Sequence, residues 1–324
     1  MKAIKIIALV LVCAIVVGVG AFGIIKHKEV RYVEDAMKAA VATIKDGTWQ
    51  NIIAGSGEQD EEVSEAPDIT FVPGTYGGVE FNSFEDVANY YATVYNNTKA
   101  ETAEYIAQDG GRPVFYALVG TEKLELKPDS LLVDGKANAI VNGMVPNILG
   151  IAFSGNIIGL PPGVNRDPNL DEENGMSFRT SMVVADDIEN AAVVDNGDGT
   201  ITLTIVPKEV NLSAKGMDAQ GHFFNALGAL DQVVENLGVV TWASGTTSEN
   251  VVARYKDGSA TVKVDVASGK IVEADYHMIV KVDVTHATLA GVVKDKSASL
   301  TLYYDNHFPA SDEDLMNVRQ LTRA

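Results

Sequence analysis

Residues 260–284 read ATVKVDVASGKIVEADYHMIVKVDV, and this stretch decides the fold class. Within 260–266, Ala and Val alternate with Thr, Lys and Asp, which is the two-residue period of a half-buried β-strand. Turn residues occupy 265–269, and the alternation resumes from 272 to 284. The apolar set of this second run is Val272, Ala274, Tyr276, Met278, Val280, Val282 and Val284. The pattern predicts two long antiparallel strands with one dry face and one wet face.

In the second run, the residues that alternate with the apolar set lie on the wet face, and they include Glu273, Asp275 and His277. We expect a solvated strand surface there, because side chains two apart on one strand share a face. A third strand is predicted at 298–304 from the same alternation. A long one-sided sheet must bury its dry face, and either packed helices or a bound lipid can do so.

Elements on the N-terminal side of this stretch complete the predicted domain. A hairpin is expected at 192–206 with its turn at 195–199, and strand-like runs are found at 113–119, 123–127, 130–134 and 137–142. One helix begins near Ser83 and carries a tyrosine stripe that includes Tyr91, and another is expected at 218–237. The predicted fold class is α+β, with a curved, mainly antiparallel, half-barrel-like sheet packed with a few helices.

The N-terminus carries an apolar segment long enough to cross a bilayer. Residues 6–25 contain no charged side chain, and about 20 apolar residues span the hydrocarbon core. A cleaved signal peptide is the alternative, but the length of the run favours a retained anchor. The expected boundaries are 1–28 for a transmembrane anchor or uncleaved signal, 29–54 for a helical stalk, 55–75 for an acidic flexible linker, 76–310 for an extracytoplasmic sheet domain and 311–324 for a short C-terminal helix.

Composition narrows the range of functions. The chain carries 44 Asp and Glu against 25 Lys and Arg, a formal charge of -19. This balance argues against nucleic acid as a partner, because nucleic-acid binding requires clustered cations. The single cysteine, Cys13, lies in the apolar N-terminal run, so the exported part offers no thiolate metal site. The sequence also lacks H-E-x-x-H, G-x-S-x-G and P-loop motifs, and we expect no catalytic residue, metal or cofactor.

An uncharged run from 137 to 164 is the main functional clue in so acidic a chain. Its prolines and glycines argue against a second membrane helix, since lipid-exposed backbone must satisfy its own hydrogen bonds. Three interpretations remain: a buried connection, an apolar flap over a cavity for a hydrophobic ligand, or a segment that contacts the membrane surface or a partner protein. A ligand cavity would be lined by Met144, Ile148, Ile151, Phe153, Ile157 and Tyr91.

The element order and several stretches of this sequence resemble known protein families in three ways. The order of a helix, long antiparallel strands, an apolar insertion and an exported location resembles the LolA and LppX type of half-barrel carriers of lipids and lipoproteins over about residues 76–310. DNGDGTITLTIVPKE (195–209) and GLPPGVNRDP (159–168) resemble exported, membrane-anchored proteins of Clostridia-type bacteria that have no assigned activity. YKDGSATVKVDVASGKIVEA (255–274) is similar to the strand pair of PepSY modules.

The sequence therefore predicts a single-pass protein of the cell membrane whose bulk is extracytoplasmic. Its expected role is to bind a lipid or other hydrophobic ligand without catalysis, with the membrane engaged through residues 6–25. A cell-envelope interaction or scaffold protein with a solid core is the alternative, with an envelope protein as partner. A hydrolase assembled from scattered residues is the least favoured reading.

Overall fold

The computed structural model describes residues 66–100, 105–107, 113–115, 119–127, 130–137, 156–161, 180–214, 216–224, 226, 240–289 and 293–311. Within these ranges, no helix is long and apolar enough to cross a membrane. The predicted anchor at 6–25, the stalk at 29–54 and the C-terminal helix beyond Ser311 lie outside the described residues. The predicted linker is described only from residue 66 onward.

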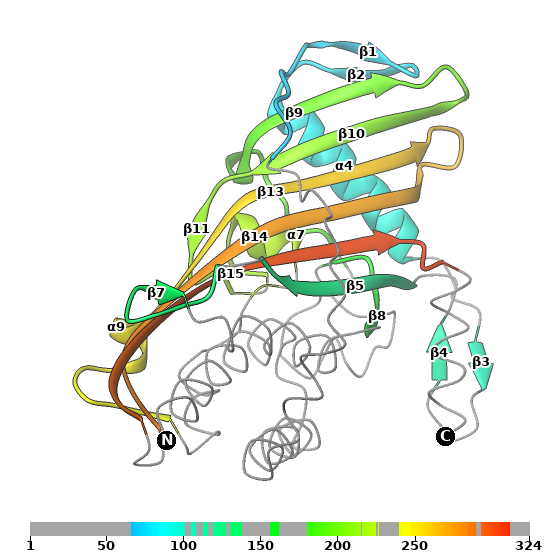
Figure 1. Cartoon of the computed structure of the whole chain (residues 1–324). Coiled ribbons are helices and arrows are strands. Elements are labelled where there is room, and N and C mark those ends of the chain that lie inside the picture. The colour runs from blue at the N-terminus through cyan, green and yellow to red at the C-terminus, as the bar shows by residue number, and fades with distance from the viewer. Residues whose placement is uncertain are drawn as a thin grey trace.

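Three long strands form the centre of a mainly antiparallel sheet (Figure 1). They are β13 (Val251–Asp265), β14 (Lys270–Leu289) and β15 (Val293–Phe308). β10 (Thr200–Pro207) and β9 (Ile188–Asp195) continue the sheet beyond β13, and the expected hairpin at 192–206 is confirmed. The chain is thus sheet-rich α+β, as predicted, and its described strands do not close into a barrel.

Two separate pairs of strands extend the opposite edge of the sheet, beyond β15. β5 (Val119–Leu126) pairs with Leu302–His307 of β15 and holds β8 (Asn156–Gly159) on its other side. β6 (Leu132–Val133) pairs with β15 at Ala298–Ser299 and forms a hairpin with β7 (Lys136–Ala137). The remaining short strands are β1 (Gly74–Tyr76), β2 (Val79–Phe81), β3 (Tyr105–Ala107), β4 (Pro113–Phe115), β11 (Val210–Asn211) and β12 (Val240–Trp242).

The alternation read from residues 260–284 is confirmed from Ala274 to Val284, where the dry set is buried. Val272 is the exception: it is 44% exposed, and Ile271 is buried in its place. The pairing register explains this difference, because Lys263 faces Glu273 while Val264 faces Ile271. One extra residue on β14 forms a β-bulge here and reverses the parity of the strand.

Further irregularities lie in the long strands. In β13 the register shifts between Lys256 and Ser259, and Asp257 adopts a positive φ of 50°. In β14 it shifts after Val284, beside His286 with a φ of 51°. The long strands bend downward towards this end in Figure 1, as expected where bulges increase local twist.

Helices cover part of the dry face. α4 (Phe84–Lys99) begins at the predicted N-cap, where Ser83 Oγ accepts from the Asp86 amide at 3.3 Å. It lies against one side of the sheet (Figure 1). α7 (Ala219–Phe223) contradicts the prediction of a continuous helix over 218–237, because Phe224 is extended with φ −126° and ψ 163°. The short elements η2 (Ala185–Asp187) and α9 (Thr247–Asn250) complete the described helices.

The described end of the predicted linker contacts this domain. The ring of Phe71 packs edge-on against Phe84 of α4, with centroids 5.4 Å apart. Tyr76 donates its hydroxyl hydrogen to the carbonyl oxygen of Val72 at 2.8 Å. Residues 71–76 therefore belong to the packed structure on the sheet side of the linker.

Candidate functional site

Tyr91, the one predicted ligand residue on a helix, lies in a buried aromatic cluster beneath α4. Its hydroxyl oxygen is 2.8 Å from that of Tyr276 on β14, and both side chains are fully buried. The rings of Tyr95 and Phe223 lie 5.9 and 5.3 Å from the Tyr91 ring. Phe224 extends the cluster across Tyr276 and towards β15. The tyrosine stripe of α4 thus packs on the dry face, and its contact with a ligand remains a prediction.

The electrostatics of the tyrosine pair follow from this burial. Desolvation raises the pKa of Tyr91 well above its usual value, and the neighbouring phenols of Tyr276 and Tyr95 raise it further. Burial also raises the pKa of Tyr276. Both phenols therefore stay protonated at neutral pH, and the pair acts as a hydrogen-bonded contact between helix and sheet.

The other predicted ligand residues belong to the uncharged run. Ile157 lies on β8, where it is the register partner of Thr121 on β5. Met144, Ile148, Ile151 and Phe153 lie outside the described residues. The described end of the run reaches α4, because Leu160 is buried and its carbonyl oxygen accepts from the Tyr95 hydroxyl at 3.4 Å. Of the six predicted ligand residues, the structure describes Tyr91 and Ile157, and both lie at the same end of the sheet.

The two ends of the uncharged run are attached to one edge of the sheet. β7, where the run begins, is joined through β6 to the Ala298–Ser299 segment of β15. β8, near its end, is joined through β5 to the Leu302–His307 segment. Figure 1 shows β7 and β8 at opposite ends of this edge. Residues 138–155 thus connect two points along the same side of β15.

Asn306 is a polar residue on the dry face near this edge. It is 2% exposed, and within the part of the chain that the structure describes neither its side-chain nitrogen nor its side-chain oxygen has a hydrogen-bond partner. Its register partners are Tyr276 on β14 and Glu122 on β5. Since a buried amide without partners costs on the order of 1–3 kcal/mol, this position fits contact with a polar group that the described residues do not supply.

Close packing around Asn306 involves Gly120. A Cβ atom at Gly120 would lie 2.4 Å from the carbonyl oxygen of His307 and 3.3 Å from Oδ1 of Asn306. Only glycine therefore allows β5 to approach β15 so closely at this point.

The described residues contain a repeated histidine–aspartate arrangement that the sequence analysis missed. Each of the four histidines in the described residues places its Nδ1 atom next to an aspartate oxygen at 2.6–2.8 Å. The pairs are His222–Asp187, His277–Asp305, His286–Asp295 and His307–Asp275. The second and fourth pairs are neighbours, because Asp275-Tyr276-His277 on β14 lies antiparallel to Asp305-Asn306-His307 on β15.

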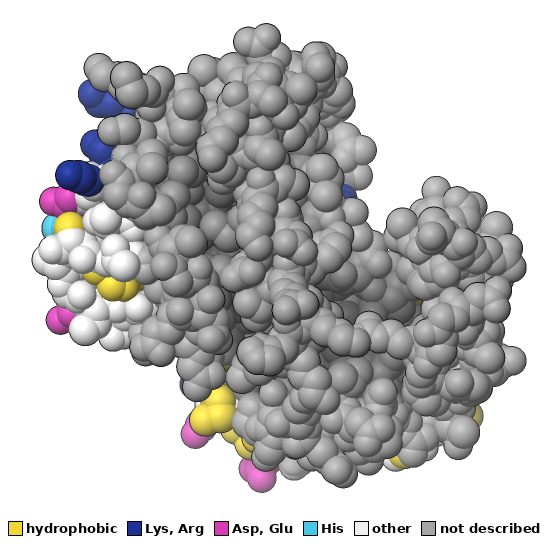
Figure 2. Space-filling model, turned by 90° about the horizontal axis from the view of Figure 1, so that it is seen from below, with side chains coloured by type: hydrophobic (Ala, Val, Ile, Leu, Met, Phe, Trp, Pro, Cys, Tyr) yellow, Lys and Arg dark blue, Asp and Glu magenta, His cyan; other side chains and the backbone are white. Residues whose placement is uncertain are grey.

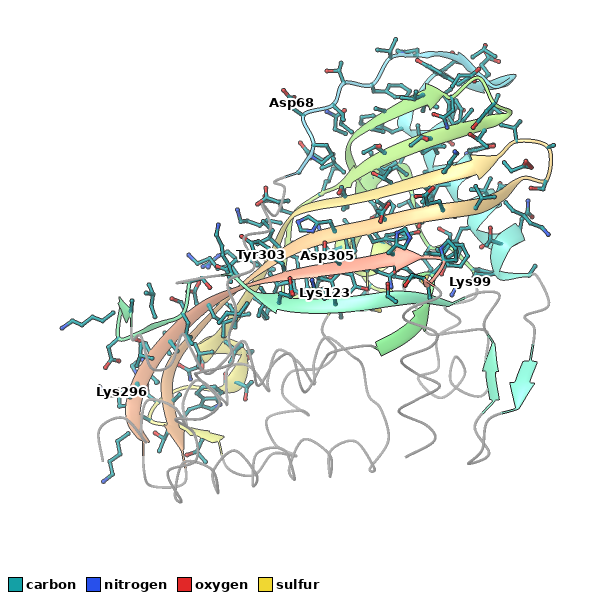
Figure 3. All side chains as sticks on the ribbon, turned by 45° about the vertical axis from the view of Figure 1, so that its right-hand side comes forward. Asp68, Lys99, Lys123, Lys296, Tyr303 and Asp305 are labelled. Atoms are coloured by element: carbon teal, nitrogen blue, oxygen red, sulfur yellow. The ribbon has the colours of Figure 1, made fainter. Side chains whose placement is uncertain are left out.

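His277 corrects the expectation of a solvated strand face. Its side chain is only 12% exposed, and its Nε2 atom is buried with no hydrogen-bond partner among the described residues. Ile279 and Tyr303 are also buried on this face, with the ring of Tyr303 6.3 Å from that of His277. Figure 3 shows Tyr303 and Asp305 on β15 beside Lys123 on β5. The sequence contains a signal for these pairs in two Asp-x-His tripeptides, at 275–277 and 305–307. Only the pairing register shows that the histidine of each tripeptide lies beside the aspartate of the other.

The far end of the long strands carries a mixed set of charges. His286 pairs with Asp295 at 2.8 Å, and Lys296 pairs with Asp134 of the β6–β7 turn. Seen from below, basic, acidic and histidine side chains lie together on the described part of this end (Figure 2). In the described residues of this end, charges of both signs thus lie close together.

The described residues contain no group of three or more His, Cys, Asp or Glu side chains that could hold a metal ion. The turn at 195–199 uses its carboxylates internally: Asp195 accepts from the amide of Gly197, and Asp198 accepts from the amide of Thr200, both at 2.9 Å. These bonds are those expected of a hairpin turn.

Comparison with models of protein families, with curated proteins and with solved structures finds no match to this chain. The functional argument therefore rests on the geometry of the molecule.

Proposed function

We propose that the protein is a membrane-anchored, extracytoplasmic binding protein for a lipid or other hydrophobic ligand. The ligand lies between the dry face of the sheet near β15 and the uncharged run of residues 137–164. Residues 6–25 anchor the chain in the membrane, and the sheet curves in the manner of a half-barrel carrier. The protein performs no chemistry on the ligand at this site.

The attachment of the uncharged run carries this proposal. Because β7 and β8 both join the β15 edge, residues 138–155 start and finish beside the apolar face. An uncharged segment held at both ends is suited to cover an apolar ligand, since neither the segment nor the ligand then exposes apolar area to water. In a chain of formal charge -19, the lack of charge across this run supports such a contact.

The amide of Asn306 supports the same location. Ligand sites are mostly apolar and contain a few polar groups that fix the orientation of the ligand. Asn306 supplies one donor and one acceptor group at 2% exposure, on the strand from which both ends of the uncharged run are held. A lipid with an ester, amide or hydroxyl group near its polar end would pair with this amide.

Photocrosslinking of the full-length protein in bacterial membranes tests the proposal. Cells are supplied with a fatty acid that carries a diazirine and an alkyne, and tagged peptides are mapped by mass spectrometry after irradiation. We expect labelled peptides from 137–164 and from β14 or β15. Ile148→Asp should reduce labelling of these peptides about tenfold or more, because an apolar site disfavours a charge by several kcal/mol.

Val272→Asp is the matched control, since Val272 is 44% exposed on the same sheet. This variant should keep wild-type labelling, and circular dichroism checks that both variants fold. Crosslinks confined to residues 6–25 in the wild type would contradict a ligand site. That result would favour the scaffold alternative, in which the uncharged run is a solid part of the core.

A further inference from the structure

One row of the wet face carries three cations and no carboxylate. Arg254 of β13 is the direct register partner of Lys281 on β14, and Lys281 is the direct partner of Thr301 on β15. The next position belongs to Lys127, directly after β5, whose amide donates to the carbonyl oxygen of Thr301 at 2.9 Å. All three cations are exposed. The row therefore presents positive charge to water in a chain of formal charge -19.

Two of these three cations have no ion pair. Other cations on this face are paired with carboxylates: Lys123 with Glu125, Lys256 with Asp257 and Arg254 with Asp283. Among the described residues, no carboxylate forms an ion pair with Lys127 or Lys281. Arg254 and Lys281 also lie directly opposite each other, and like charges in that arrangement repel. The charge of Lys281 is therefore available to an anion from outside the chain.

Backbone hydrogen bonds hold the two lysines on either side of Thr301. The amide of Thr301 donates to Ser130 Oγ at 3.1 Å, and its carbonyl oxygen accepts from Lys127. Lys127 Nζ lies 5.8 Å from the centre of the Tyr303 ring, which places this side chain on the wet face. Because neighbouring strands are about 4.8 Å apart, the two lysines start about 10 Å apart, and their flexible stems can both reach a group above Thr301. The Thr301 hydroxyl can donate to the same group.

Two ammonium groups beside a hydroxyl suit a phosphate group. Lysine binds phosphate as a compact point charge, and a phosphodiester offers several acceptor oxygens with one negative charge. The row also lies at the edge to which the uncharged run is attached. β5 carries β8, and Ser299, next but one to Thr301, pairs with β6. A phospholipid surface held against this row would therefore lie beside the uncharged run.

We infer that the row of Arg254, Lys281, Thr301 and Lys127 docks the domain on the phosphate groups of an anionic phospholipid membrane. This inference rests on the proposed anchor, because a tether at residues 6–25 raises the effective concentration of the domain at the bilayer, so that weak contacts suffice. Each cation near an anionic surface favours the docked state about fivefold. Acidic groups farther than about 8 Å oppose docking little at physiological salt, because their charge is screened. Docking brings the proposed ligand site to the source of its lipid.

The test uses the full-length protein reconstituted into vesicles, with a fluorophore on Ser299→Cys in a Cys13→Ser background. Ser299 is the register partner of Asp283 and so lies on the wet face beside the row. The vesicles contain a lipid with a nitroxide on its head group, which quenches the fluorophore on contact. We expect strong quenching in phosphatidylcholine mixed with phosphatidylglycerol and weak quenching in phosphatidylcholine alone. Lys127→Gln combined with Lys281→Gln should lower the ratio of docked to undocked domain about 25-fold.

Lys263→Gln combined with Lys296→Gln is the matched control, because it removes the same net charge from cations that have partners. Lys263 pairs with Asp198 at 3.5 Å, and Lys296 pairs with Asp134. This variant should keep wild-type quenching, and thermal unfolding checks that each variant folds. A fluorophore on Val272→Cys, a position 44% exposed on the same sheet, reports contact away from the row. Its quenching should stay weak in all vesicles.

Three results would overturn the inference. One is equal quenching with and without phosphatidylglycerol, and another is an equal loss of quenching in the two double variants. The third is loss of quenching when inorganic phosphate is added at constant ionic strength, since the row would then bind a free anion in place of a membrane. Flotation of the vesicles tests the anchor separately, because protein that does not float contradicts the proposed function itself. Lipid crosslinking at 137–164 does not depend on this row, so the proposed ligand site and the docking row can fail separately.

Discussion

The two faces of β14 carry different kinds of residue at the same positions along the strand. On the dry face, Tyr276 is fully buried and bonds to Tyr91 of α4. On the wet face, the next residue, His277, bonds to Asp305 of β15. At Tyr276, a polar atom of the dry face is thus paired with a helix packed on the sheet. At His277, a polar atom of the wet face is paired with a carboxylate on the neighbouring strand.

This difference shows that substitutions on the two faces of one strand should differ in their effect on stability. Substitutions on the dry face act on the free energy of unfolding, because each side chain there is enclosed by others. Substitutions at exposed positions of the wet face, such as His307, should change the stability little, because water compensates for lost contacts. The following predictions test whether substitutions on the two faces differ in their effect on the stability of the protein.

The largest effect is expected from truncation on the dry face. Leu203 of β10 is fully buried, and Leu203→Ala should lower the free energy of unfolding by about 2–5 kcal/mol. Val194 of β9 is 53% exposed, and Val194→Ala should stay within about 0.5 kcal/mol of the wild type. Urea unfolding measures both variants. Similar losses in the two variants would remove the distinction between the faces.

The tyrosine pair tests how the dry face satisfies its polar atoms. Tyr276→Phe leaves the buried Tyr91 hydroxyl without this partner and should cost about 1–3 kcal/mol. Tyr91→Phe should cost a similar amount. The double variant should cost less than the sum of the two, because it removes both hydroxyls together. Additive losses in this double-mutant cycle would show that the contact contributes nothing to stability.

Alkaline pH should lower the free energy of unfolding through the buried tyrosines of the dry face. The pKa values of Tyr91 and Tyr276 are raised in the folded protein, whereas in the unfolded chain tyrosine ionises near pH 10. Their contribution is therefore complete below about pH 10 and is lost as the pH rises towards the folded pKa values. Unfolding free energies measured from pH 8 to 11 should fall more steeply for the wild type than for the Tyr91→Phe, Tyr276→Phe double variant.

A smaller effect should separate the two histidine pairs of the wet face. His277→Leu should lower stability by about 1 kcal/mol, because a largely buried hydrogen bond to a carboxylate is lost. His307→Leu should change stability by less than about 0.5 kcal/mol, since that pair is exposed. Thermal unfolding at low and high salt measures both. A larger loss for His307 would mean that burial does not rank the two pairs.

The smallest effect is expected at the β9–β10 turn. The pKa of Asp195 is lowered mainly because its carboxylate accepts from the amides of Gly197 and Gly77. This contribution is present above the pKa of the unfolded chain, near 4, and is lost as the pH falls through the folded pKa. Asp195→Asn should lower the Tm slightly at pH 7 and flatten its dependence on pH below about 4. An unchanged acid profile would contradict this role.

Much of the fold was predictable from local pattern. The alternation of residues 274–284 predicted the dry and wet faces, and Ser83 marked the start of α4. These features depend on neighbours in sequence, which the chain itself displays. The parity change at Val272 was not predictable, because a bulge depends on the residues opposite. The end of α7 at Phe223 was missed because Phe224 leaves the helix to pack on Tyr276 and Tyr304.

The candidate sites also combine features that the sequence shows with features that only the tertiary structure shows. By itself the sequence determined that residues 137–164 are uncharged, that the chain is acidic and that two Asp-x-His tripeptides are present. Only the tertiary structure decided that β7 and β8 share one edge, that Asn306 is buried with no partner among the described residues and that His277 lies beside Asp305 on the next strand. The physical reason is that alternation fixes which face a side chain takes, whereas strand register fixes its neighbours, and register is a property of residues far apart in the chain.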